Sequence, residues 1–404
     1  MNDKAYKFLF RLGMTFILIW APLALGAVPK RIWSITPILA IITVLTFMWL
    51  WRLNNGLHTM QCPIRKTGLD KPLFAFVTLA VVSFVFSIYK YDSFYALLRL
   101  LSYVAVFSLV VNNYNKSLRN YLIGLVICIG TGLSVYGLLQ YFGFFSHQWW
   151  NPADFLASTY VNHNHFSGYL ELVIPVTIGA ITAYRGQGGK IKKILLPGGL
   201  IIMLMAFVFA QSRGAWLSLG ISLFLMNIIL VRREILKKRN LVISIVLVSL
   251  VFAFLYSSGG LVSRRIESIK EVTKGEASVG MRLAIWQGTV DIISCNPWLG
   301  TGIGTFAWGF PRHRPMVLAN VSVHYAHNDY LHMAAEMGIF ALPIMLLLLI
   351  RIIFLGLSRA APVAVGCAIG ILSLSLHGLV DFNFHIPANM ILVAVCAAII
   401  MKES

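Results

Sequence analysis

The densest group of side chains that could do chemistry lies in the stretch VHYAHNDYLHMAAEMG. It holds three histidines and two acidic residues, namely His324, His327, Asp329, His332 and Glu336. A neutral histidine can accept a proton near pH 7, which makes His327 a candidate general base. On a continuous helix, His324 and His327 would share one face, and His332 and Glu336 would share another.

Two other interpretations of this stretch stay open. Two histidines at that spacing could hold a metal ion, but the sequence has no HExxH motif and no other Cys or carboxylate cluster to complete a ligand set. We therefore expect no metal. Alternatively, the histidines are structural groups whose hydrogen bonds are satisfied near the membrane interface.

Two arginines are candidates for binding an anion. Arg213 interrupts the apolar run FVFAQSRGAWLSLG, where a charge at mid-membrane would cost about 3 kcal/mol. Gly214 beside it would let a ligand approach the backbone. The structural alternative is a tight outer turn whose Arg213 reaches the lipid headgroups. Arg282 begins an amphipathic segment and could equally be a solvated residue.

Further polar groups stand near the same predicted face. Asn164 and His165 lie in NHNHFSGYLELVIP, at the entrance of a predicted helix, where an asparagine could also serve only as a cap. Glu171 follows about one turn inside an apolar run, which is unusual for a carboxylate. HGLVDFNFHIPAN adds three groups on that side, namely His377, Asp381 and His385. Polar groups from separate parts of the chain thus converge on the outer face.

The elements that must position these residues are apolar. Of the 404 residues, 58% are hydrophobic and 12% are charged, a composition that excludes a soluble enzyme, a disordered chain and a disulfide scaffold. We expect an all-α polytopic integral membrane protein of about 12 transmembrane helices, each about 20 residues long. The predicted spans are 12–29, 34–51, 72–89, 94–111, 120–143, 166–184, 194–211, 214–231, 241–259, 337–357, 361–380 and 384–401.

The net charge of +19 reflects topology rather than nucleic-acid binding. Most Lys and Arg residues fall in alternate loops, which the positive-inside rule assigns to the cytoplasm together with the N-terminus. The chain is then a single membrane domain, 1–404, with one large periplasmic loop, 260–336. Within this loop we expect helices at 264–274, 282–294 and 325–336, the last running into the next span.

Five motifs resemble the O-antigen ligase superfamily, which includes O-antigen ligases, some O-antigen polymerases and O-linked oligosaccharyltransferases. They occur in order along the chain: NxNHFxGYL at 162–170, SRGAWL at 212–217, RLAIWQ with NPWLGTGIGTF at 282–306, HNDYLHMAAEMG at 327–338 and HGLVDFNFHIPAN at 377–389. The similarity runs from about residue 160 to the end, and the first 150 residues are similar only in their hydrophobic spans.

The resemblance implies transfer of a glycan from an undecaprenyl-pyrophosphate-linked donor to an acceptor hydroxyl. The reaction would occur at the periplasmic side of a bacterial inner membrane, among membrane lipids, without metal or cofactor. The superfamily's essential residues correspond to Arg213, Arg282 and His327. We assign the substrate-binding roles to His324, Asn164, His165 and Asp381.

The leading hypothesis is an O-antigen ligase whose acceptor is the lipid A core. One dominant outer loop favours it over the alternative, an O-antigen or exopolysaccharide polymerase. A membrane transporter or flippase is the alternative of a different class, although the sequence shows no internal repeat.

Overall fold

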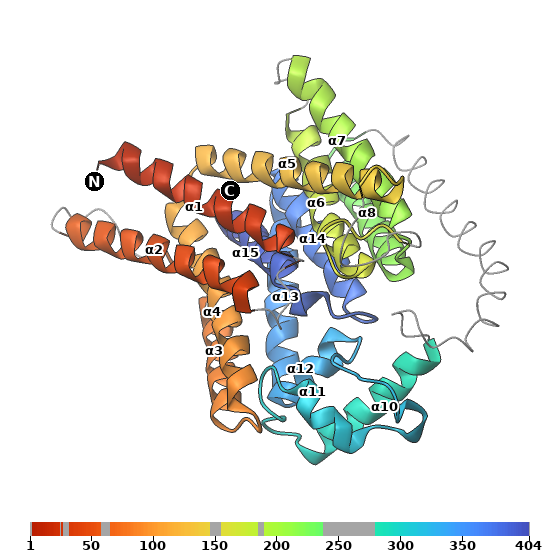
Figure 1. Ribbon diagram of the computed structural model, residues 1–404. Coiled ribbons are helices and arrows are strands. Elements are labelled where there is room, and N and C mark those ends of the chain that lie inside the picture. The colour runs from red at the N-terminus through yellow and green to blue at the C-terminus, as the bar shows by residue number, and fades with distance from the viewer. Residues whose placement is uncertain are drawn as a thin grey trace.

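The computed structural model describes residues 2–24, 26, 32–57, 65–145, 155–184, 190–236 and 279–403, and the described residues form helices and loops without a β-strand (Figure 1). The N-terminal helices are α1 Asp3–Leu23, α2 Ile32–Leu57, α3 Asp70–Val85, α4 Lys90–Asn113, α5 Lys116–Tyr141, α6 His163–Ala183, α7 Lys190–Phe209 and α8 Arg213–Arg232. The remaining ones are α10 Val279–Cys295, α11 Phe306–Gly309, α12 Asp329–Met337, α13 Ala341–Ser358, α14 Pro362–His377 and α15 Pro387–Lys402. Short 3₁₀ turns are η3 Phe310–His313, η4 Met316–Leu318 and η5 Asn383–His385.

Many of these helices are suited to a bilayer. Six are long and apolar enough to span it, namely α1, α4, α5, α6, α8 and α13. Shorter apolar helices occur at Thr36–Arg52, Lys193–Phe209, Pro362–His377 and Pro387–Lys402. The described part of the chain is therefore all-α, and its apolar helices are those of a membrane protein. Every predicted span corresponds to a helix except 241–259, which lies outside the described residues.

Helices α6 and α14 form the centre of the bundle (Figure 1). Glycines let their backbones approach closely, as is common between membrane helices. A Cβ atom at Gly366 would lie 2.4 Å from the carbonyl oxygen of Pro175, and one at Gly370 would lie 2.9 Å from that of Leu172. This close approach places the polar side chains of α6 within reach of those at the end of α14.

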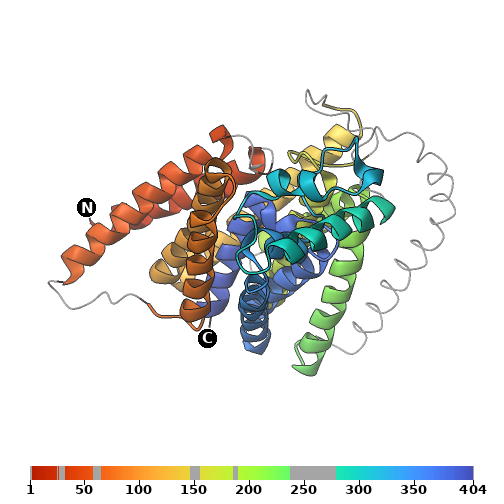
Figure 2. The same cartoon turned by 90° about the horizontal axis from the view of Figure 1, so that it is seen from below.

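A layer formed by α10, α11 and α12 packs against one end of the bundle, and Figure 2 shows it from below. It has a small apolar core of its own, which includes Ile285, Ile292, Phe306, Phe310 and Leu318. The expected helix at 282–294 is confirmed as α10. The expected helix at 264–274 lies outside the described residues, as does the first part of the predicted loop 260–336.

The expected helix at 325–336 starts four residues later than predicted and does not run into the next span. The helix begins only at Asp329, because the side chain of Asn328 accepts the N–H groups of Tyr330 and Leu331, both at 3.0 Å. It ends at Gly338, whose φ of 80° separates α12 from α13. Consequently His324 and His327 lie in an irregular segment and do not share a helix face. The predicted pairing of His332 with Glu336 is confirmed, at 3.1 Å.

Gly338 gives a direct test of this junction. We expect Gly338→Ala to destabilise the protein by roughly 1–3 kcal/mol, because alanine disfavours a positive φ. The added Cβ would also lie 2.0 Å from the carbonyl oxygen of Trp298. Thermal unfolding in detergent would measure the loss. Gly124→Ala in α5 is the matched control, since nothing lies within 4 Å of its Cβ position. Equal melting temperatures for both variants would contradict this account.

Candidate functional site

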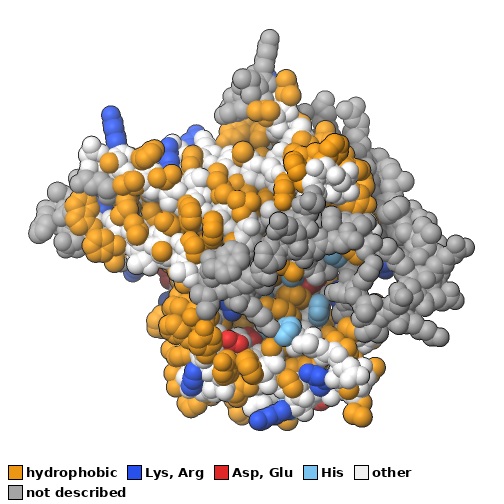
Figure 3. Space-filling model, in the orientation of Figure 1, with side chains coloured by type: hydrophobic (Ala, Val, Ile, Leu, Met, Phe, Trp, Pro, Cys, Tyr) orange, Lys and Arg blue, Asp and Glu red, His pale blue; other side chains and the backbone are white. Residues whose placement is uncertain are grey.

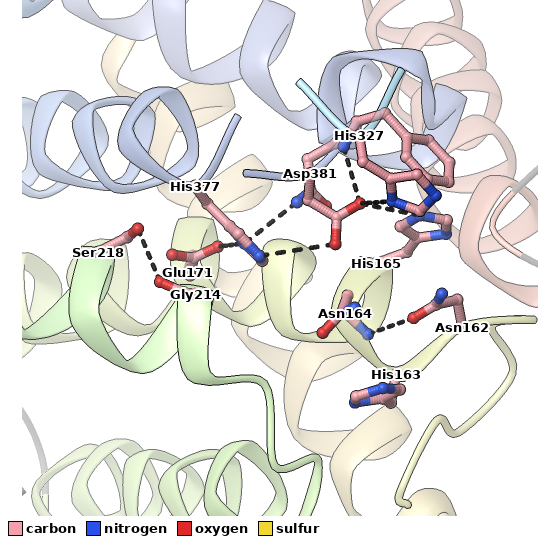
Figure 4. Close-up of polar contacts among 12 residues, drawn as sticks. Asn162, His163, Asn164, His165, Glu171, Gly214, Ser218, His327, His377 and Asp381 are labelled. Atoms are coloured by element: carbon pink, nitrogen blue, oxygen red, sulfur yellow. Dashed lines mark hydrogen bonds and ion pairs between the residues drawn. The ribbon is translucent and has the colours of Figure 1, made fainter. Parts of the chain in front are cut away.

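Glu171 is a carboxylate buried inside the bundle, with 0% exposure. Its Oε2 lies 2.8 Å from Nδ1 of His377, and its Oε1 accepts the hydroxyl of Ser373 at 2.7 Å. These contacts join α6 to α14 (Figure 4). A buried charge of this kind is tolerated only when it is paired. The unusual position of Glu171 in an apolar run is thus explained by a partner that is distant in sequence.

Asp381 is the point on which three histidines converge (Figure 4). Its Oδ1 lies 3.9 Å from both Nε2 of His165 and Nδ1 of His327, and its Oδ2 lies 3.9 Å from Nε2 of His377. The carboxylate is 1% exposed. Since the histidines come from α6, from the segment before α12 and from α14, the site brings together three distant motifs of the sequence. We call these four residues the Asp381 cluster.

The electrostatics of this cluster favour a charged aspartate beside a neutral histidine. Burial alone would raise the pKa of Asp381, but His165, His377 and His327 outweigh burial and keep the pKa below its usual value. Burial lowers the pKa of His327, Asp381 partly opposes this, and Arg282 lowers it further. His327 is therefore neutral near pH 7 and able to accept a proton.

The backbone at His327 is held in an unusual conformation, with a φ of 49°. A positive φ in a residue other than glycine costs of order 1 kcal/mol and persists only where the surroundings fix it. The indole N–H of Trp286 on α10 donates to the His327 carbonyl at 3.3 Å. The imidazole also packs edge-on against Phe382, with ring centroids 4.9 Å apart. Trp286 and Phe382 were not predicted as site residues.

The predicted arginines lie at different distances from the cluster. Arg282 on α10 is half-buried, its Nε is buried without a hydrogen-bond partner, and its charge acts on Asp381 and His327. Arg213 begins α8 and is exposed. Its neighbour Gly214 lies against His377: a Cβ atom added at Gly214 would be 3.1 Å from Nε2 of the His377 ring. Arg213 therefore stands at the edge of the cluster.

The predicted substrate-binding residues fall into two groups. Asn164 and His165 are buried in the first turn of α6, and Asn162 caps this helix by accepting the N–H of Asn164 at 2.7 Å. Nε2 of His165 is buried without a hydrogen-bond partner. His324 is exposed and lies 3.2 Å from the Ser322 hydroxyl, outside the Asp381 cluster.

A second polar cluster supports the loops around the site. Both oxygens of Glu336 accept main-chain N–H groups, from Gly304 at 2.7 Å and from Phe306 at 2.9 Å. Burial would raise the pKa of Glu336, but His332, His385 and the N–H of Gly304 together outweigh burial and lower it to about 2. These contacts give Glu336 a structural role.

The second cluster also contains Asp329, which binds His385 at 2.7 Å. Ligand atoms of His332, Glu336 and His385 lie within 4.8 Å of one another, as in a metal site. Two of these groups are already engaged, however, because Glu336 holds two N–H groups and Nδ1 of His332 accepts the N–H of Ala326 at 3.2 Å. The expectation of a site without metal stays a prediction.

Two asparagines that sequence reasoning missed complete the polar network. Nδ2 of Asn383 lies 3.1 Å from Nδ1 of His377, and Asn389 donates to Oδ1 of Asn383 and to the carbonyl of His165, each at 3.1 Å. Both asparagines are 0% exposed. Their position in an otherwise apolar C-terminal stretch is the signal that could have identified them.

Charged and polar groups are thus gathered inside a bundle of apolar helices, next to a layer that packs on one end of it. In the face drawn in Figure 3, histidine and acidic side chains gather in a hollow. This arrangement defines a multi-spanning membrane protein with a sheltered polar site, a class that includes enzymes acting on lipid-linked substrates.

Comparison with known families is consistent with this class. Residues 198–346 match the family model described as O-antigen ligase, and this match confirms the resemblance inferred from the motifs. Members of this family are ligases and polymerases of the glycosyltransferase type. The matched segment contains Arg213, Arg282 and His327. No curated protein matches the chain.

The Glu171 contacts can be tested through stability. We expect Glu171→Ala to cost about 3–5 kcal/mol of unfolding free energy, because it leaves His377 and Ser373 buried without their partner. Ser373→Ala removes one hydrogen bond and should cost about 1 kcal/mol. Thermal unfolding in detergent would compare the two. A Glu171→Ala protein as stable as Ser373→Ala would show that the ion pair is unimportant.

Proposed function

We propose that this protein is an O-antigen ligase-type glycosyltransferase. It transfers a glycan from undecaprenyl pyrophosphate to a hydroxyl of the lipid A core, at the periplasmic face of the bacterial inner membrane. The observation that carries the proposal is His327, whose Nδ1 lies 3.9 Å from Oδ1 of the buried Asp381 and whose pKa is lowered by burial and by the charge of Arg282. A base, a cation and a stabilising carboxylate are the groups that transfer from a pyrophosphate donor needs.

Arg282 and Arg213 bind the pyrophosphate. A guanidinium is always charged and offers paired N–H donors that match phosphate oxygens. Negative charge grows on the pyrophosphate as its bond to the sugar C1 breaks, and a cation placed there stabilises the transition state. Pyrophosphate needs no proton to leave, so a general acid is dispensable.

His327 is the general base. Its Nδ1 faces Asp381, so its Nε2 is the atom available to the acceptor hydroxyl. The hydroxyl oxygen forms a bond to C1 while its proton passes to Nε2, and the pyrophosphate leaves with the electron pair of the broken bond. Asp381 then stabilises the imidazolium. Direct attack inverts the configuration at C1, and the mechanism requires no metal ion or cofactor.

The substrate-binding residues surround these groups. His165 belongs to the Asp381 cluster, and Asn164 lies next to it in the first turn of α6. His324 lies outside the cluster, where it would contact the acceptor as that substrate enters. The donor and the acceptor then meet at His327 from opposite sides.

Deletion of the gene tests the function itself. A ligase deletion should leave free lipid A core and accumulate carrier-linked polymer, which gel analysis of lipopolysaccharide would show. Core bearing a single repeat unit would instead indicate a polymerase, and loss of protein glycosylation would indicate an oligosaccharyltransferase.

His327→Ala should fail to restore the deletion strain, because catalysis by a general base contributes about 10²–10⁴-fold. His313→Ala in the same layer is the matched control and should restore it. Normal transfer by membrane-inserted His327→Ala would exclude His327 as the base.

The pH dependence of transfer should report on His327. Since only the neutral imidazole accepts a proton and its pKa lies below the usual value of about 6.5, transfer should be constant near pH 7 and fall in more acidic solution. Asp381→Asn removes the group that raises this pKa, so the acid midpoint should move to lower pH while the maximal rate falls. Rates measured in detergent from pH 5 to 8 would show the shift. A midpoint that moves upward would contradict the assignment.

A further inference from the structure

A group of cations gathers where the segment before α3 contacts α13 and α15. Its members are Arg65, Lys66, Lys71, Arg351 and Lys402. The guanidinium of Arg351 on α13 donates to the carbonyl of Gly68 at 2.9 Å. The ammonium of Lys402, the last residue of α15, donates to the carbonyl of Lys66 at 3.3 Å. These contacts bring together cations from three distant parts of the sequence, and we call the five residues the basic group.

The basic group has no carboxylate to neutralise it. In the part of the chain that the structure describes, none of its members forms an ion pair, and their side chains donate to main-chain carbonyls. Asp70 is occupied by Thr67, whose N–H and hydroxyl it accepts at 2.8 and 2.6 Å. Glu403 is paired with Arg119. The excess of positive charge therefore suits an anionic ligand.

Exposed apolar side chains continue from the basic group along α13. Phe354 lies one turn after both Ile350 and Arg351, so the three side chains share one face of the helix. Ile350 is 61% exposed and Phe354 is 69% exposed, whereas Ile352 on the opposite face is buried. The outer face of α13 thus carries a cation next to a surface suited to hydrocarbon chains.

Helix α3, which packs against α13, repeats this arrangement. Phe74 lies one turn after Lys71 on the same face and is 74% exposed. Phe76 and Ala80 point the other way and are buried. Two neighbouring helices therefore each present a cation followed by an exposed aromatic side chain, on surfaces that face away from the interior of the bundle.

The depth of these cations suits the headgroup region of a bilayer. Arg351 precedes the end of α13 at Ser358 by seven residues, about 10 Å along the helix. A long arginine side chain can cover apolar surface with its stem while its guanidinium reaches the headgroups. The positive-inside pattern assigns this end of the bundle to the cytoplasmic leaflet, where anionic lipids attract basic groups.

We propose that this surface binds an anionic diacyl phospholipid of the cytoplasmic leaflet. The phosphate contacts Arg351, which offers paired N–H donors, and Lys71, which offers a point charge. The two acyl chains lie along the exposed faces of α13 and α3, against Phe354 and Phe74. The rest of the basic group supplies further positive charge around the headgroup. The bound lipid then holds α3 against α13, and this role is independent of the proposed function.

Lipid binding to the purified full-length protein tests the site. Phosphatidylglycerol would be titrated into the protein in detergent, and the bound lipid would be counted by native mass spectrometry. We expect Lys71→Gln to weaken binding about fivefold, the effect of removing one cation near a lipid surface. The double variant Lys71→Gln with Arg351→Gln should weaken it at least about tenfold.

Lys4→Gln is the matched control. Lys4 is the second residue of α1, as Lys71 is of α3, and both side chains are exposed. This variant loses the same charge at the same predicted face and should bind phosphatidylglycerol like the wild type. Arg351→Gln also loses the bond to Gly68. If the double variant does not fold, the comparison of Lys71→Gln with Lys4→Gln decides the result.

Three results would overturn the site. The first is equal affinity for phosphatidylglycerol in Lys71→Gln and Lys4→Gln. The second is equal retention of zwitterionic phosphatidylcholine, which would show that charge does not select the lipid. The third is displacement of the lipid by excess inorganic phosphate, which would show that the acyl chains contribute nothing. His327→Ala should bind phosphatidylglycerol like the wild type, so the outcome does not depend on transfer activity.

Discussion

The structure depends on one constraint: charged groups inside an apolar bundle must find partners within the protein. Glu171 meets it through His377 and Ser373, at 2.8 and 2.7 Å. Because these contacts join α6 to α14, they fix the segment after α14 that carries Asp381. Close packing through the glycines of α14 makes the distances possible. The contact of Glu171 with His377 thus stabilises the buried carboxylate and also positions the Asp381 cluster.

The layer outside the bundle obeys the same constraint through a different set of bonds. Glu336 holds the N–H groups of Gly304 and Phe306, and Asp329 holds His385. The Asp329 bond lies two residues after His327, and directly before His327 the N–H of Ala326 donates to Nδ1 of His332 at 3.2 Å. The unfavourable backbone conformation is thereby supported by burial and hydrogen bonding on either side. A base held in this way needs little rearrangement when substrate arrives.

The sequence predicted the helices well because a run of about 20 apolar residues has few other stable states in a membrane. It also placed Asp381, His165 and His327 in one site, since their motifs converge on the same face. It could not show that Glu171 pairs with His377, because that contact depends on how closely two helices pack. It misjudged the start of α12, where the cap formed by Asn328 is a local choice that helical spacing does not reveal.

The +19 charge includes one guanidinium that enters the candidate site. Arg282 on α10 is half-buried, its Nε is buried without a hydrogen-bond partner, and its charge lowers the pKa of both Asp381 and His327. The constraint that pairs Glu171 with His377 is therefore left unmet at this Nε. A guanidinium in such a position suits an anionic ligand, because it offers paired N–H donors to phosphate oxygens. Under the proposed function, the charge that helps to keep the base neutral would then also hold the donor.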